Sequence, residues 1–164
     1  MKDIRKLAVI LLVVCIFCCS CGLTCSKETM YNWIEHNAHN WDKIVEDFPF
    51  EKSDSIVSID PAPLSEMRGL LHPISIVFSP QSDLFSISFE GSYCGETSKT
   101  LLFTQMQTNV VEIGSIHLSI NDIPPARITE NSCRWEGIGA DGTGYMYIEL
   151  VTPGWFYLET YYPT

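Results

Sequence analysis

The apolar residues of the chain recur with two different periods, and the change between them falls at Pro49. Residues 28–48 place apolar side chains at steps of three and four, a spacing that predicts one amphipathic helix. The predicted helix ends before Pro49 because proline cannot continue a helix. Its apolar side consists of Tyr31, Ile34, Ala38, Trp41, Ile44, Val45 and Phe48.

After Pro49 the period is two, which is typical of β-strands. The segment 84–91 is the clearest case, because Phe85, Ile87 and Phe89 alternate with serines. Short links of turn-forming residues join most of these segments, so we expect neighbouring strands to pair as antiparallel hairpins. Strands are predicted over residues 55–60, 74–79, 84–91, 100–106, 110–120, 126–137, 144–151 and 155–162.

The last two predicted strands carry apolar residues on both faces. A two-residue turn at positions 153–154 would place Leu150 opposite Tyr157 and Val151 opposite Phe156. A sheet with one face in water shows clean alternation, which this hairpin lacks, so we expect both faces to be covered. The prediction is a mainly β fold: an antiparallel barrel or sandwich of about eight strands, with the N-terminal amphipathic helix packed on it. A cavity for an apolar ligand is a sharper form of the same expectation.

The N-terminal segment joins a short basic region to a long apolar run. Lys2, Arg5 and Lys6 precede about 13 apolar residues, which is the layout of a secretory signal peptide. Residues 7–24 carry no charge over 18 positions, so an uncleaved membrane anchor is an alternative. Either segment would deliver the rest of the chain to the far side of a membrane.

A third alternative is a bacterial lipoprotein signal, which ends in a small residue followed by a cysteine that receives a diacylglyceryl group. Cys21 after Ser20 fits this junction best, although Cys18 stands where such signals usually have leucine. Cys25 after Thr24 fits less well. We therefore divide the chain into a lipoprotein-type signal peptide at 1–21 and one β-rich extracytoplasmic domain at 22–164, with Cys21 as the lipid attachment site.

The charge balance narrows the set of partners. Without the first 21 residues the chain has 7 basic and 19 acidic residues, a net charge of −12. A surface this acidic repels phosphate backbones, so nucleic acid is not an expected partner. It also provides no polybasic patch for anionic lipids, so the lipid or anchor is the expected link to the membrane. The predicted location is the bacterial cell envelope, with secretion as the alternative.

Two cysteines in the β-rich region invite a disulfide in an oxidising compartment. Cys94 and Cys133 would close a loop of about 40 residues, which the chain-entropy model values at about 3–4 kcal/mol. A competing interpretation makes Cys94 a nucleophile activated by His117, but no further residue of the sequence supports that pairing.

Aromatic residues concentrate in the last third of the chain. Exposed together, they would form a binding surface that stacks on sugar rings or anchors a protein partner. The competing interpretation is that they fill the core. The candidate binding surface consists of Trp135, Tyr145, Tyr147, Trp155, Tyr157 and Tyr161.

Two short motifs resemble a phosphate-binding site and a metal site, but the residues around them do not fit those sites. The glycines of 137–142 match a phosphate-binding spacing, but the residues after them predict a strand rather than the required helix. His36 and His39 share one side of the predicted helix, where a solvated surface explains them without a metal. We expect no catalytic residues, no cofactor and no metal.

The sequence therefore favours a membrane-anchored extracytoplasmic binding or interaction module, whose ligand is an apolar small molecule, a glycan or a protein. A small secreted hydrolase without a recognisable motif is the alternative from another class, and a structural envelope lipoprotein is a third. Perturbed carboxylates or histidines in a cleft would favour the hydrolase. A dry apolar cavity would favour a small-molecule ligand, and a packed core without either would favour the structural role.

Overall fold

The computed structural model describes residues 25–47, 56–60, 71–118, 123–139 and 142–163. Nine strands form one antiparallel sheet in the order β1-β2-β3-β5-β9-β8-β7-β6, with β4 paired to β5 outside this row. The helices are α2 (Lys27–Asp47) and α3 (Val110–Leu118). The strands are β1 (Val57–Ile59), β2 (Pro73–Ser79), β3 (Leu84–Phe89), β4 (Tyr93–Cys94), β5 (Thr97–Phe103), β6 (Arg127–Ile128), β7 (Ser132–Glu136), β8 (Tyr145–Thr152) and β9 (Trp155–Tyr161).

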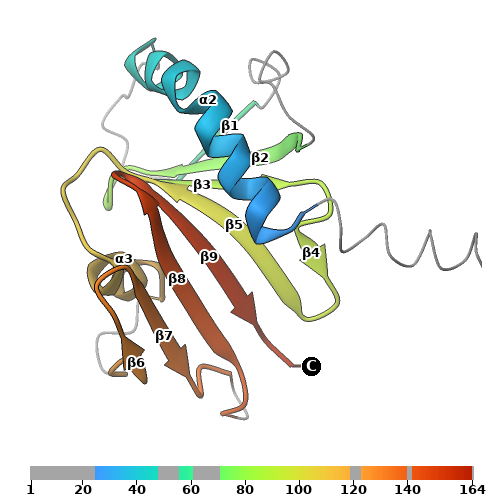
Figure 1. The fold of residues 1–164 in the computed structure, drawn as a ribbon, viewed down its shortest axis with the longest axis vertical. Coiled ribbons are helices and arrows are strands. Elements are labelled where there is room, and N and C mark those ends of the chain that lie inside the picture. The colour runs from blue at the N-terminus through green and yellow to red at the C-terminus, as the bar shows by residue number, and fades with distance from the viewer. Residues whose placement is uncertain (1–24, 48–55, 61–70, 119–122, 140–141, 164) are drawn as a thin grey trace, which may run out of the picture.

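The predicted mainly β, antiparallel character is confirmed, whereas the closed architecture is not. The sheet is open, with the short strands β1 and β6 at its edges, so it does not close into a barrel. All nine described strands belong to this one sheet, so they do not form a two-sheet sandwich either. The double-faced apolar hairpin is covered by one helix on each face instead of by a second sheet (Figure 1).

Helix α2 crosses one face of the sheet diagonally (Figure 1). Its first turn is capped by Ser26, whose hydroxyl accepts a hydrogen bond from the Thr29 backbone amide at 3.2 Å. Trp33 and Trp41 point into the core, where they meet the rings of β3, β5 and β9 edge-on. The buried core on this side is dominated by Met30, Trp33, Ile34, Trp41, Val45, Ile76, Phe78, Phe85, Ile87, Phe89, Leu101, Phe103, Trp155 and Tyr157.

Helix α3 corrects the prediction of a strand over 110–120. The amides of Val111 and Glu112 donate to the side-chain oxygen of Asn109 at 3.0 and 3.1 Å, and Glu112 accepts in return from the Asn109 amide at 3.3 Å. This reciprocal pair is a capping box, which starts a helix by satisfying its free amides. The residues that follow Asn109 are rich in β-branched side chains and have the composition of a strand. The cap and the packing of Val110 and Ile113 against the sheet stabilise the helix instead.

Helix α3 closes a second core on the opposite face of the sheet. Gly114 allows the close approach, because a Cβ there would lie 2.0 Å from the Trp135 ring. The second core contains Leu84, Leu102, Val110, Ile113, Cys133, Trp135, Met146, Ile148, Phe156 and Leu158. Two cores on two faces explain why the β8–β9 hairpin is apolar on both sides.

The register of that hairpin differs from the predicted one by a single residue. Thr152 pairs with Trp155 across a two-residue turn, as expected, but Leu150 pairs with Phe156 because the ladder is shifted between Leu150 and Thr152. This β-bulge at Val151 adds one residue to β8. As a result Tyr157 faces α2, and Phe156 faces α3. The predicted register had instead placed Phe156 opposite Val151, on the other face of the hairpin.

Candidate functional site

The six aromatic residues predicted as one binding surface are divided by the sheet. Trp135 is buried beneath α3, whereas Trp155 and Tyr157 are buried beneath α2, with exposed fractions of 1%, 2% and 1%. These three fill the two cores, so the prediction of a single aromatic surface is wrong for them. The other three residues are Tyr145, Tyr147 and Tyr161, which are partly exposed.

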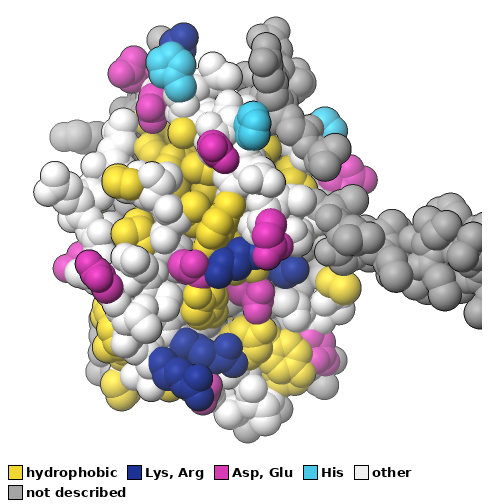
Figure 2. All heavy atoms as spheres, viewed as in Figure 1, with side chains coloured by type: hydrophobic (Ala, Val, Ile, Leu, Met, Phe, Trp, Pro, Cys, Tyr) yellow, Lys and Arg dark blue, Asp and Glu magenta, His cyan; other side chains and the backbone are white. Residues whose placement is uncertain are grey.

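The partly exposed tyrosines share one face of β8 and β9 with charged residues. Residues 145, 147 and 149 alternate with the buried Met146 and Ile148, which point to α3, so the odd-numbered side chains lie on the α2 side. Figure 2 shows this surface below the position of α2 in Figure 1, where basic, acidic and apolar side chains lie beside one another. We call it the tyrosine face and define it as Arg134, Tyr145, Tyr147, Glu149, Glu159 and Tyr161.

A row of three stacked side chains crosses the tyrosine face from β9 to β7. The rings of Tyr161 and Tyr145 stack with centroids 5.5 Å apart and an interplanar angle of 29°. The Arg134 guanidinium lies 4.0 Å from the centroid of the Tyr145 ring and also bonds Glu136 at 3.0 Å. Since β8 lies between β9 and β7, Tyr145 is held between its two neighbours. The edge of the Tyr145 ring therefore remains for other contacts.

Glu159 accepts hydrogen bonds from two tyrosine hydroxyls. Tyr145 donates to one carboxylate oxygen at 2.6 Å, and Tyr157 donates to the other at 2.7 Å. The hydrogen bond to Glu159, with burial as a second cause, raises the pKa of Tyr145 to about 12. Burial, followed by the same carboxylate, raises the pKa of Tyr157. Both hydroxyls thus stay protonated and fixed in direction over the physiological pH range.

Lys27 and Glu149 join the start of α2 to the tyrosine face. The Lys27 ammonium forms an ion pair with Glu149, which also accepts a hydrogen bond from Tyr147. The ammonium lies 5.4, 5.5 and 5.8 Å from the ring centroids of Tyr31, Tyr147 and Tyr157, within the range of cation–π attraction. We call this arrangement the Lys27 cage.

The Lys27 cage stabilises both of its charges. Burial works against the charged form of Lys27, but the hydrogen bond and negative charge of Glu149 raise the pKa of Lys27 overall. Burial likewise disfavours the ionised carboxylate, but hydrogen bonds from Lys27 and Tyr147 lower the pKa of Glu149. The first turn of α2 is therefore fixed to β8 by a charged contact between residues 122 positions apart.

Replacing Glu159 by glutamine is expected to lower the pKa of Tyr145, because a neutral amide no longer opposes the tyrosinate. In the wild-type chain the raised pKa means that protonated Tyr145 contributes stability below its usual pKa of about 10. That contribution is lost as the pH rises towards about 12. NMR titration of ring-labelled tyrosine measures the shift, with Tyr145→Phe for assignment. Glu90→Gln, an exposed site between β3 and β4, should leave the Tyr145 titration unchanged.

The cysteine predictions have different outcomes. Cys21 lies outside the described residues. Cys94 is exposed on β4, Cys133 is buried on β7 facing α3, and both are free thiols, so the predicted disulfide is not made. Between β4 and β7 lie β5, β9 and β8, which corresponds to about four strand spacings of roughly 4.8 Å. A disulfide requires Cα atoms within about 7 Å.

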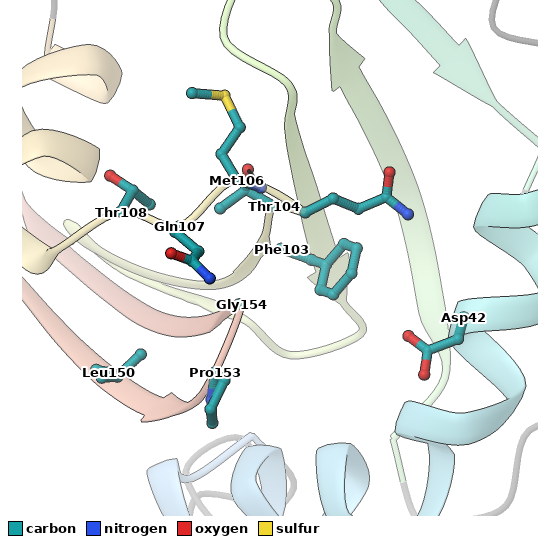
Figure 3. Close-up of a pocket in the computed structure, with 10 residues that line it drawn as sticks. Asp42, Phe103, Thr104, Met106, Gln107, Thr108, Leu150, Pro153 and Gly154 are labelled. Carbon is teal, nitrogen blue, oxygen red and sulfur yellow. Dashed lines mark hydrogen bonds between the residues drawn. The ribbon is translucent and has the colours of Figure 1, made fainter.

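Two clefts lie at the far end of the sheet from the tyrosine face. The first has a volume of about 520 Å³ and is bordered by Asp42 of α2 and by the β8–β9 turn (Figure 3). The second, of about 610 Å³, lies beside the β2–β3 turn and shares Met106 with the first. Neither is lined by a residue predicted as functional, and exposed Gln105 and Gln107 make the first partly polar. They offer little support for a dry apolar cavity.

The spacing of the two carboxylates on the tyrosine face is compatible with acid–base chemistry, but the pKa of Glu149 is not. Glu149 and Glu159 are diagonal neighbours on adjacent strands, which is a spacing that acid–base pairs can have. A general acid at neutral pH needs a raised pKa, whereas that of Glu149 is lowered. Within the described ranges no group of three or more His, Cys, Asp or Glu side chains is arranged to hold a metal ion.

Comparison with protein-family models, curated proteins and solved structures gave no match for the chain. In the part of the chain that the structure describes, neither helix has the length and apolar character needed to cross a membrane.

Proposed function

We propose that the protein is a membrane-anchored extracytoplasmic binding module whose tyrosine face docks a protein partner. The observation that carries the proposal is the row Tyr161–Tyr145–Arg134, which is partly exposed and already held in one arrangement by stacking. Glu159 fixes the direction of the Tyr145 hydroxyl as well. Binding therefore requires little ordering of these side chains, and that preorganisation favours affinity.

The composition and shape of the tyrosine face favour a protein over a glycan or an apolar small molecule. Tyrosine and arginine are enriched at the energetic centres of protein interfaces, where they combine large area with polar tips. A sugar would need a free ring face for stacking, but Tyr161 and Arg134 already cover Tyr145. An apolar ligand would need an enclosed cavity, and the clefts described above lie at the other end of the sheet.

A photoreactive residue in place of Glu136, which lies on the tyrosine-face side of β7, is expected to cross-link one protein partner in cells that make the chain. The matched control is the same residue in place of Ile128, which is exposed but pairs with Cys133 and faces the α3 side. In the double variant Tyr145→Ala with Tyr161→Ala, the yield of the product should fall about tenfold or more, as for interface hot spots.

The folded state of each cross-linking variant is checked by circular dichroism. Equal yields from the two positions, or a yield unaffected by the tyrosine changes, would contradict the proposed partner face. A product that is sensitive to glycosidases and resistant to proteases would replace the protein partner by a glycan.

We also propose that Cys21 carries the lipid that holds the domain at the membrane. The buried state of Cys25 supports this choice, since that thiol is 2% exposed within the core beneath α2. Burial also raises the pKa of the Cys25 thiol and so reduces its reactivity. Of the two cysteines that follow a small residue, Cys21 is thus the better acceptor for a diacylglyceryl group.

Replacing Cys21 by alanine is expected to move the protein from the membrane fraction to the soluble fraction, whereas Cys25→Ala should leave it with the membrane. Intact mass spectrometry of the wild-type protein should give a chain that begins at Cys21 and carries a diacylglyceryl group. A Cys21→Ala protein that remains in the membrane would indicate an uncleaved anchor. An unmodified wild-type chain with another N-terminus would indicate a cleaved, secreted form.

A further inference from the structure

The distance between the proposed lipid and the folded domain is limited by the sequence. Three residues separate Cys21 from Cys25, and four residue steps span at most about 14 Å when fully extended. Cys25 is buried in the core, and the Lys27 cage fixes the helix that begins two residues later. With a lipid on Cys21, as proposed above, Cys25 must lie within about 14 Å of the lipid-bearing residue, and α2 begins two residues beyond Cys25.

The residues around Cys25 form one end of the molecule. Lys99 of β5 donates a hydrogen bond to the Cys25 carbonyl at 3.2 Å. The neighbouring Ser98 pairs with Tyr93 of β4, and the Tyr162 amide donates to the Glu96 carbonyl at 3.0 Å. The start of α2, the strand β4 and the C-terminal end of the chain accordingly lie at the same end of the sheet (Figure 1).

Two large side chains at this end are exposed. Tyr93 is 64% exposed and Tyr162 is 44% exposed. We call this part of the surface the anchor-side edge and define it as Tyr93, Glu96, Lys99 and Tyr162. Tyrosine is the kind of residue that gathers at membrane–water interfaces, because its ring enters the headgroup layer while its hydroxyl stays hydrated.

We infer that the anchor-side edge rests on the membrane and that Tyr93 and Tyr162 enter its headgroup layer. The inference depends on the proposed lipid at Cys21, which supplies attachment, whereas the tyrosines supply orientation. Charge contributes little attraction, since Glu90 and Glu96 accompany Lys99 at this end and the domain is acidic overall. A neutral headgroup such as phosphocholine is therefore the fitting lipid surface, in preference to an anionic one.

The chain is well suited to a fluorescence test of this contact. Its four tryptophans are all buried, with exposed fractions of 2% or less, so lipid-borne quenchers should reach none of them. New tryptophans are introduced one at a time as Tyr93→Trp and Tyr162→Trp. The control variants are Met106→Trp, at the far end of the sheet, and Ile128→Trp, at the edge strand β6, both of which are exposed positions.

Each full-length lipidated variant is bound to phosphatidylcholine vesicles with and without nitroxide-labelled headgroups. The emission added at positions 93 and 162 is expected to shift to the blue on binding and to be mostly lost with the labelled lipid. The emission added at positions 106 and 128 should change in neither respect.

Three results would overturn the inference, and they separate it from the anchor itself. If the protein binds vesicles but the tryptophans at positions 93 and 162 are not quenched, the anchor-side edge does not contact the membrane. The proposed lipid at Cys21 would be unaffected by that result. Stronger quenching at position 106 or 128 would assign the membrane contact to another surface. Protein that does not sediment with vesicles would overturn the lipid at Cys21 and the orientation with it.

Discussion

The Trp41→Ala variant is expected to lose about 3–5 kcal/mol of unfolding free energy, as other buried tryptophans do on truncation. Trp41 is 1% exposed, and its ring meets those of Phe85, Phe103 and Trp155 at centroid distances of 5.5, 5.8 and 5.5 Å. Removing it opens a cavity between α2 and three strands. Since single domains have total stabilities of about 5–15 kcal/mol, such a loss would be conspicuous in urea unfolding.

Two further variants calibrate the Trp41 result. Trp41→Phe keeps an aromatic ring and should lose less than Trp41→Ala. Glu46→Ala, at an exposed position of the same helix, should change the unfolding free energy by about 0.5 kcal/mol or less. A Trp41→Ala protein as stable as the wild type would contradict the docking of α2 on the sheet. The contact between Lys27 and Glu149 would then be in doubt as well, because it requires α2 to lie on the sheet.

The Gly114→Ala variant is expected to be destabilised by about 2–3 kcal/mol, against the usual direction for this substitution. In an exposed helix alanine is favoured over glycine by about 1 kcal/mol. Here the added Cβ would lie 2.0 and 2.5 Å from the Cη2 and Cζ3 atoms of Trp135, so the helix or the ring must move. Thermal or urea unfolding measures the change.

A second substitution at the contact tests whether the clash is the cause. Trp135→Leu removes the ring that the Gly114→Ala methyl would strike, so the two changes together should destabilise by less than the sum of their separate effects. Additive effects would mean that α3 does not approach Trp135 as described. A Gly114→Ala protein more stable than the wild type would also show that α3 does not lie this close to Trp135.

Much of the fold could be predicted from local patterns. Phe85, Ile87 and Phe89 were expected on one side of a strand, and all three are buried beneath α2. The helix predicted over residues 28–48, before Pro49, corresponds to α2, which ends at Asp47. The helix α3 was missed because Val110 and its β-branched neighbours have the composition of a strand. The signal that would have indicated it is the Asn109 and Glu112 pair, at the spacing of a capping box.

The candidate site was less predictable, because it depends on contacts between distant segments. The sequence indicated Tyr145, Tyr147 and Tyr161, but it gave no sign that Lys27 would meet Glu149 across the fold. The charged members of the tyrosine face follow the same alternation as its tyrosines, so Glu149 could have been added from β8 alone. Which aromatic residues are buried depends on the helix that covers each face, and α3 was absent from the prediction.

The bulge at Val151 decides which side chains meet on the tyrosine face. If Val151 were paired in the ladder instead of bulging out, it would lie opposite Phe156, and every side chain of β9 beyond Trp155 would change sides relative to β8. Glu159 would then leave Tyr145, and Tyr161 would leave the stack. Deletion of Val151 would leave the pairs from Leu150–Phe156 onwards unchanged, whereas a shift that took Val151 into the ladder would keep both faces apolar and still dismantle the site. The binding surface therefore depends on which residue of the turn region is left unpaired, and not on the side chain of that residue.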